Sequence, residues 1–184
     1  MPQSAGYGSF VGLPCLDAAA FGIGASEMRA LQLQQVLLLK VGFALATSAL
    51  ECGPSRVAHV GVFVGVEPSD GSKATPSVYS TAGAAVSVAS GRLSYVLGFV
   101  GPCISLDTAC SSALVAAHQA ASALHRSECS VALSAATKVL GEESNLATAV
   151  GGMTSRLGRC HSFDDRADGY CRGEGSAAFL LRAV

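Results

Sequence analysis

The sequence contains no tryptophan, and charged side chains make up only 14% of its 184 residues. Half of the residues are hydrophobic, so the composition is that of a well-buried folded chain and excludes a disordered one. The formal net charge is −1, and the sequence has no run of lysine or arginine. Without such a run, binding to the phosphate backbone of a nucleic acid is not expected.

A secretory leader is also lacking, because residues 1–13 contain no basic segment followed by an apolar core. We expect a cytoplasmic protein, and this pattern leaves organelle targeting open. The seven cysteines have irregular spacing. In an intracellular protein they indicate reduced thiols and not a disulfide framework.

The most hydrophobic stretch is interrupted by polar side chains. Residues 31–50 include Gln32, Gln34, Gln35 and Lys40. Such interruptions favour a buried helix over a membrane span, so no membrane association is predicted. The helix is expected to end before Gly53-Pro54.

Apolar segments with strand character alternate with segments of helical spacing along the chain. The expected helices are 27–50, 82–97 and 111–125, and the expected strands are 57–66, 103–106, 130–136 and 176–182. Several of these strands are apolar without alternation, which is typical of strands covered by helices on both faces. The sequence therefore predicts an α/β fold in one domain, with a long loop before the last strand.

Cys110 stands where the strand 103–106 meets the helix that begins near Ser111. The unpaired N–H groups and the dipole at a helix N-terminus favour the thiolate, which is the nucleophilic form of cysteine. The turn also directs backbone N–H groups toward a developing oxyanion, as the strand-turn-helix of serine hydrolases does. Cys110 is therefore the candidate catalytic residue. The alternative is a small core cysteine without chemistry.

Two sequence blocks carry a family resemblance: DTACSSALVA at residues 107–116 and GRCHSFDDRADGYCRGEG at 158–175. Together they resemble the paired signature of β-ketoacyl synthases, and most closely the ketosynthase domain of type I polyketide synthases and animal-type fatty acid synthases. Further landmarks follow in the family order, at 16–23, 61–65 and 90–95. The resemblance covers residues 16–184 as a partial N-terminal domain and leaves 1–15 unassigned.

The resemblance implies a thiolase-like fold, which in the family consists of two similar α/β halves packed face to face. Residues 16–184 correspond to the N-terminal half only, and residues 1–15 contain nothing like the family's opening strand. In the family, two histidines that assist condensation lie downstream in Gly-rich motifs, which these 184 residues do not contain. We therefore expect a homodimer or pairing with the missing C-terminal half.

The resemblance also makes Cys110 the acceptor of an acyl group from the thioester of an acyl carrier protein or coenzyme A. A malonyl-type extender on the carrier protein would then lose carbon dioxide and condense with the bound acyl group. No metal or cofactor of the chain's own is expected, since the phosphopantetheine arm belongs to the carrier protein. Two alternatives stay open: a catalytically incomplete ketosynthase fragment or pairing subunit, and, more remotely, a thiol redox or binding protein.

The histidines offer little support for a base within this chain. His118 and His125 would be carried away from Cys110 along the helix, by about 1.5 Å per residue. His59 lies in a strand and is most simply a core or surface residue. His161 lies in the long loop. It could approach the thiol only if the loop folded back in a way that the sequence does not predict.

The long loop resembles a metal site only superficially. Asp164 and Asp168 fit two positions of a calcium loop, but other positions of that template carry the wrong residues. The cysteines and histidine at 160, 161 and 171 lack the paired spacing of a zinc site. We expect the two aspartates to accept hydrogen bonds from backbone amides, and Arg172 to pair with Glu174 or a neighbour.

Overall fold

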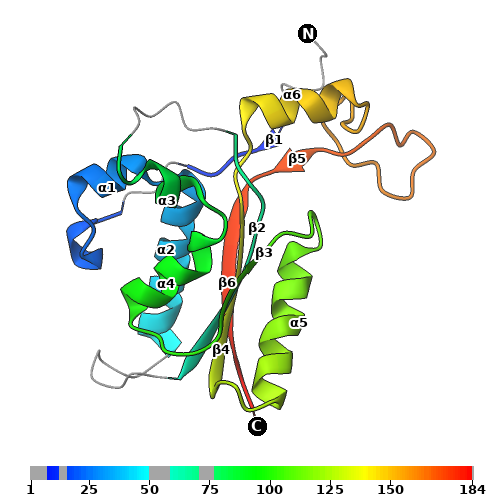
Figure 1. Ribbon diagram of the computed structural model, residues 1–184. Coiled ribbons are helices and arrows are strands. Elements are labelled where there is room, and N and C mark those ends of the chain that lie inside the picture. Colours follow the sequence, from blue (N-terminus) through cyan, green and yellow to red (C-terminus); the bar gives the residue numbers. More distant parts are fainter. Residues whose placement is uncertain (1–7, 13–15, 50–58, 71–76, 184) are drawn as a thin grey trace.

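The structure is a computed structural model that describes residues 8–12, 16–49, 59–70 and 77–183 (Figure 1). The strands are β1 (Gly8–Ser9), β2 (Val60–Val66), β3 (Cys103–Leu106), β4 (Val131–Lys138), β5 (Arg172–Gly173) and β6 (Gly175–Arg182). The helices are η2 (Ala19–Phe21), which is a 3-10 helix, α1 (Ala25–Ala30), α2 (Leu33–Ala49), α3 (Ser80–Ala84), α4 (Val88–Leu97), α5 (Ser112–His125) and α6 (Glu142–Val150).

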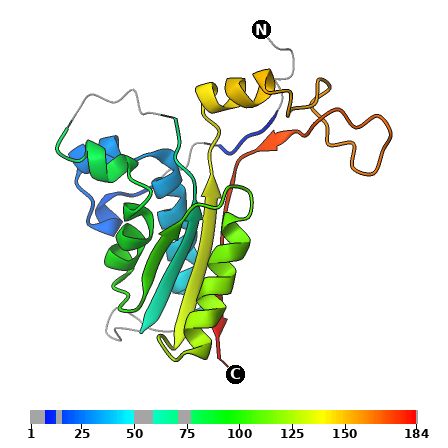
Figure 2. The same ribbon diagram turned by 45° about the vertical axis from the view of Figure 1, so that its right-hand side comes forward.

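A four-stranded sheet forms the centre of the molecule, with the strand order β3-β2-β4-β6. Strands β3, β2 and β4 are parallel, and β6 pairs with β4 in the antiparallel direction. Helices α2 and α4 pack on one face of this sheet and α5 packs on the other, so that the sheet is the middle of three layers (Figures 1 and 2). The predicted α/β architecture with helices on both faces is confirmed.

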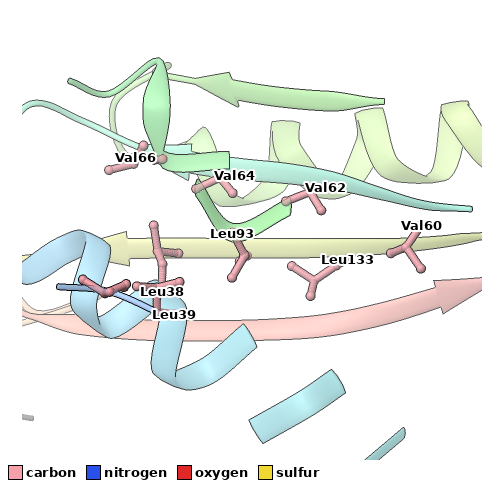
Figure 3. Close-up of a cluster of buried hydrophobic side chains, with 11 residues drawn as sticks. Leu38, Leu39, Val60, Val62, Val64, Val66, Leu93 and Leu133 are labelled. Carbon is pink, nitrogen blue, oxygen red and sulfur yellow. The ribbon is translucent and has the colours of Figure 1, made fainter. Parts of the chain in front are cut away.

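The central strand β2 divides its side chains between two apolar clusters. Val60, Val62 and Val64 point toward α2 and α4, where they meet Leu39 and Leu93 (Figure 3). Phe63 belongs to the cluster on the α5 face. All seven residues of β2 are buried, which explains why its sequence is apolar without alternation.

Small residues surround Phe63 in the contact between α5 and the sheet. Ala116, Ala120 and Ala123 of α5 are all 0% exposed, and β2 contributes Gly61 and Gly65 between its larger residues. Small side chains on both elements let the helix backbone approach the strand closely. The N-terminal turn of α5 is thereby held against the end of β2.

The single helix predicted for residues 27–50 is wrong, because the structure divides it into α1 and α2. Leu31 is extended between them, and the backbone N–H of Gln32 donates to the carbonyl oxygen of Gly83 at 3.1 Å. A side chain at Gly83 would overlap the carbonyl oxygen of Ala30. The interruption thus comes from contact with α3, a distant part of the sequence, and not from a local helix breaker.

The helix predicted for residues 82–97 is likewise divided, into α3 and α4. The side-chain amide of Gln35 donates to the carbonyl oxygens of Ala82 and Ala85 at 3.1 and 3.4 Å. Its Oε1 accepts from Arg92 Nε at 2.7 Å, and Arg92 also pairs with Glu27. This polar cluster joins α1, α2 and α4 and donates hydrogen bonds to carbonyl oxygens at the end of α3.

Four described elements, β1, η2, α6 and β5, lie where no helix or strand was predicted. Helix α6 occupies part of the expected long loop, and its first turn is held by Asp70, whose Oδ2 accepts the N–H of Ser144 at 2.9 Å. Strand β1 pairs in parallel with β5, outside the main sheet. The predicted strand start at residue 57 and the helix end at Gly53-Pro54 lie outside the described residues.

Strand β3 matches its prediction. Helix α5 and strand β6 each differ from theirs by one residue at the start, and β4 starts one residue and ends two residues later than predicted. Within the described ranges, none of the helices combines the length and apolar character needed to cross a membrane.

Candidate active site

Cys110 lies in a tight turn that joins β3 to α5. The residue before it, Ala109, has a φ of +57°, a left-handed conformation that residues with a Cβ seldom adopt. The carboxylate of Asp107 accepts the N–H of Ala109 at 2.9 Å and so supports this conformation. Cys110 itself is exposed. The sequence prediction of a thiol at a strand-to-helix junction is confirmed in its geometry.

Two serines after Cys110 tie the turn to itself. Ser112 is buried; its hydroxyl donates to the carbonyl oxygen of Ala109 at 2.7 Å and accepts the N–H of Thr108 at 2.9 Å. The hydroxyl of Ser111 donates to the carbonyl oxygen of Thr108 at 2.8 Å. The backbone N–H and C=O groups of Thr108 and Ala109 are therefore all hydrogen-bonded within the turn. These bonds hold Ala109 in its strained conformation.

Gly65 sets the distance between the end of β2 and this turn. A Cβ atom built on Gly65 would lie 2.6 Å from the carbonyl carbon of Ser112 and 2.9 Å from the backbone nitrogen of Ala113. Backbone atoms cannot move aside as the end of a flexible side chain can. Any side chain at residue 65 must push the first turn of α5, and with it Cys110, away from the sheet.

We expect Gly65→Ala to destabilise the chain by about 1–3 kcal/mol, because the added methyl group overpacks a rigid contact. The matched control is Gly91→Ala on α4, where an added Cβ meets nothing within 4 Å; it should be neutral or stabilising by up to about 1 kcal/mol. Urea denaturation of the two variants provides the comparison. Equal stability of both variants would show that the spacing at Gly65 is not critical.

A cavity of about 1060 Å³ opens beside Cys110. Its walls come from the carboxyl ends of β2 and β4, the start of α5, the beginning of β6 and the segment from Tyr170 to Gly175. Ligand sites in parallel α/β sheets commonly lie at this edge. Lys138 and Glu67 lie in the wall and form an ion pair of 2.8 Å.

Sequence reasoning identified the thiol but missed most of this wall. Thr137 and Lys138 are contributed by β4, and Thr148 by a helix that was taken for loop. The order of the predicted strands could have indicated the contribution of β4, because the carboxyl ends of neighbouring parallel strands meet at one edge of a sheet.

The loop after α6 is held by its aspartates as expected. Asp164 Oδ1 accepts the N–H of Arg166 at 2.9 Å, and Asp168 Oδ2 accepts the N–H of Arg156 at 3.0 Å. The side-chain hydrogen bond from Arg166 holds the pKa of Asp164 well below its usual range. A hydrogen bond from the side chain of Ser155 lowers the pKa of Asp168. Both carboxylates therefore keep their charge, and their role in the loop, under mildly acidic conditions.

Arg172 and Glu174 hold other parts of the structure instead of pairing with each other. Arg172 Nη1 donates to Thr148 Oγ1 at 3.2 Å and to Asn145 Oδ1 at 3.4 Å, both on α6. The carboxylate of Glu174 accepts the backbone N–H groups of Val11 and Leu140, each at 2.9 Å. The expected Arg172–Glu174 pair is replaced by these bonds, which fasten the cavity wall to α6 and to the N-terminal segment.

The structure places the four histidines as follows. His118 and His125 are exposed on α5, and His59 is exposed at the start of β2. His161 is more enclosed, with 13% of its side chain exposed and Nδ1 at 3.6 Å from Asp168 Oδ1. None of the four is among the described residues that line the cavity. The sequence offers little support for His161 as a base, and its position outside the cavity wall adds none.

Comparisons with known proteins show the family. The sequence profile described as "Beta-ketoacyl synthase, N-terminal domain" matches residues 3–184. The chain belongs to the β-ketoacyl synthases. The match to this family begins inside the segment 1–15 that the sequence alone left unassigned, and the domain boundary at residue 16 stays a prediction.

The relatives of this β-ketoacyl synthase chain are polyketide synthases. A non-reducing polyketide synthase of Penicillium roqueforti is 38% identical over 194 residues, which cover 100% of this chain and 8% of that protein. The phenolphthiocerol synthesis polyketide synthase type I of Mycobacterium marinum is 41% identical over 187 residues, covering 97% of this chain and 9% of that protein. The chain thus spans less than a tenth of these relatives.

Solved ketosynthases have the same fold. The oxazolomycin ketosynthase domain of Streptomyces albus superposes with a TM-score of 0.83 at 30% identity, covering 96% of this chain and 33% of that one. The ketosynthase from module 6 of the Bacillus subtilis bacillaene synthase gives a TM-score of 0.78 at 30% identity, covering 92% and 30%. The thiolase-like fold is confirmed, and this β-ketoacyl synthase chain corresponds to about a third of a solved ketosynthase chain.

Proposed function

We propose that these 184 residues supply the acyl-accepting part of a polyketide ketosynthase, with Cys110 as the nucleophile. The observation that carries this proposal is the exposed thiol at a strained strand-to-helix turn, beside a cavity at the carboxyl edge of the parallel strands. Family membership supports it, because β-ketoacyl synthesis requires an acyl group to be held while a second unit reacts.

In the first step, Cys110 Sγ attacks the carbonyl carbon of an acyl thioester on an acyl carrier protein or on coenzyme A. A carbon–sulfur bond forms to Cys110, the bond to the donor sulfur breaks, and the donor leaves as a free thiol. The N–H of Ser112 donates to the carbonyl oxygen of Ala109 at 3.0 Å, so stabilisation of the oxyanion falls to other backbone N–H groups of the turn and of the first turn of α5. Asp107, Ser111 and Ser112 hold the turn without entering the reaction.

In the second step, a malonyl-type extender on the carrier protein loses carbon dioxide, and its carbanion attacks the acyl group on Cys110. The new carbon–carbon bond releases Cys110 as a thiolate. By resemblance to the family, two histidines from motifs outside these 184 residues assist this step. The phosphopantetheine arm arrives with the carrier protein and enters the cavity as part of the substrate.

A second candidate function is structural: the chain would be a ketosynthase portion that supports the fold of the enzyme or pairs with another chain, and would perform no condensation. The observation in its favour is that the chain corresponds to 30–33% of the solved ketosynthase chains it matches. Acylation of Cys110 separates the two candidates in part, because a purely structural portion need not accept an acyl group.

The test is incubation with an acyl coenzyme A, followed by peptide mapping. Trypsin leaves Cys103 and Cys110 together in the peptide 93–126, and cleavage before Asp107 then separates them. We expect one acyl group per chain, in the fragment 107–126. Acylation elsewhere, or none at all, would contradict the proposed role of Cys110.

We further propose that this chain associates with a second copy or with the remainder of a ketosynthase. Large apolar side chains of α6 and the loop after it are exposed, among them Val150 (71%), Leu157 (67%) and Phe163. Exposed apolar surface of this kind drives association. Sedimentation of the 184-residue chain should show species heavier than a monomer, which the double substitution Val150→Ser and Leu157→Ser reduces. A compact monomer at every concentration would contradict this expectation.

A further inference from the structure

Two cysteines of the loop beside the cavity are in direct contact. The backbone N–H of Cys171 donates to Cys160 Sγ, with 3.1 Å between nitrogen and sulfur, and Cys160 Sγ lies 3.9 Å from the carbonyl oxygen of Cys171. The Cys160 sulfur therefore lies against the main chain of Cys171. Cys171 Sγ itself lies 3.6 Å from the carbonyl oxygen of Arg172. Because the sulfur of a cysteine is only three bonds from its own nitrogen, a change of χ1 at Cys171 can bring its sulfur closer to that of Cys160.

The residues on each side of Cys171 are held in place. The N–H of Tyr170 donates to the carbonyl oxygen of Met153, and the N–H of Ser155 donates to that of Tyr170, both at 3.0 Å. The residue after Cys171 is Arg172, whose guanidinium is bound to α6. Cys171 is thus fixed within the loop, and the contact from its N–H places Cys160 Sγ against it.

The two thiols also differ in accessibility in a way that suits stepwise oxidation. Cys160 is exposed, and Cys171 is half-buried in the cavity wall that also contains Cys110. Cys129 offers a contrast, since it is buried under α5 and burial raises the pKa of its thiol. An external disulfide can reach Cys160 first, and Cys171, whose backbone N–H contacts Cys160 Sγ, is then placed to resolve the intermediate.

We infer that Cys160 and Cys171 form an oxidation-sensitive pair, which a small-molecule disulfide such as glutathione disulfide converts into an intramolecular disulfide. The Cys160 thiolate attacks one sulfur of glutathione disulfide, giving a mixed disulfide and one glutathione thiolate. The Cys171 thiolate then attacks Cys160 Sγ and releases the second glutathione. Two protein thiols are oxidised, glutathione disulfide is reduced to two glutathione molecules, and the two protons from the protein thiols go to these products.

The bond would close a ring over residues 160–171 and fix one wall of the cavity. Cys171 and Arg172 both line that cavity, so the ring restricts the segment past which a ligand must move to reach Cys110. This consequence for acyl transfer depends on the proposed function, whereas the disulfide itself does not.

Peptide mapping of the full 184-residue chain tests the bond. Trypsin cuts after Arg159, Arg166 and Arg172, so the two cysteines fall in separate peptides, 160–166 and 167–172. After treatment with glutathione disulfide and alkylation of the remaining thiols, we expect these two peptides to be joined, with loss of two hydrogen atoms from their summed mass. Dithiothreitol should separate them again. The joined pair should persist in Cys110→Ala and Cys103→Ser, and be lost in Cys160→Ser.

Separate glutathione adducts on the two peptides, or a bond from Cys171 to the peptide that holds Cys110, would overturn the inference. The effect on the cavity has its own readout, which is the rate of Cys110 alkylation by a bulky maleimide. Oxidation should slow that rate several-fold, reversibly, and should leave it unchanged in Cys160→Ser. An unaltered rate in the oxidised chain would overturn the link to the cavity, while failure of Cys110 to accept an acyl group would bear only on the proposed function.

Discussion

Replacing Cys110 by alanine is expected to abolish covalent acylation of the chain by an acyl thioester. Sulfur is the atom that forms the bond, and alanine leaves the turn otherwise intact, because the hydrogen bonds of the turn come from Asp107, Ser111 and Ser112. The loss should therefore be complete and should occur without unfolding. Intact-protein mass spectrometry after incubation with acyl coenzyme A measures it, and circular dichroism checks the fold.

The matched control for this experiment is Cys103→Ala. Cys103 is also exposed and lies seven residues earlier, but it belongs to the edge strand β3 and not to the turn. The control should keep the full acyl load. Label that survives in Cys110→Ala, at Cys103, Cys160 or Cys171, would mean that exposure of a thiol and not its place in the turn decides reactivity.

The second large effect concerns carbon–carbon bond formation. We expect the 184-residue chain, once acylated, to yield no β-ketoacyl product from malonyl carrier protein, and to lose its acyl group only by slow hydrolysis. The cavity wall contains no histidine among the described residues, and the loss of each positioned acid–base or oxyanion group typically costs about 100-fold or more in rate. Acyl transfer needs less assistance, since a thiolate is itself a strong nucleophile.

Mass spectrometry of the released thioesters provides the measurement, with Cys110→Ala as the blank. A β-ketoacyl product formed by the purified chain, and absent from Cys110→Ala, would show that the described residues suffice for condensation. Addition of a C-terminal ketosynthase half is expected to restore product formation if the two parts associate.

Sequence reasoning predicted the strand-turn-helix geometry around Cys110 well because its signals are local. The apolar residues 103–106, the small residues around Cys110 and the helical spacing beyond it are adjacent in the chain. The strain at Ala109 could not be predicted, because nothing in its residue type indicates a positive φ. Its support from Asp107 becomes visible only in three dimensions.

The errors have a common physical cause, which is contact between residues distant in sequence. The break between α1 and α2 depends on Gly83, and the start of α6 depends on Asp70. Arg172 was expected to find a partner nearby in its own segment, and it reaches α6 instead. Tertiary contacts of this kind override local helix preference and leave no local sign in the sequence.

Because Gly65 lies so close to Ser112, the position of the Cys110 sulfur and the shape of the cavity depend on different parts of the structure. The sulfur is aimed by main-chain spacing between β2 and α5, whereas the shape of the cavity is set by other elements, including Thr148 of α6 and the segment around Cys171. Substitutions in those elements can reshape what the cavity accepts without shifting Cys110. Among descendants of such a sequence, ligand preference can therefore diversify while the position of the Cys110 sulfur is inherited unchanged.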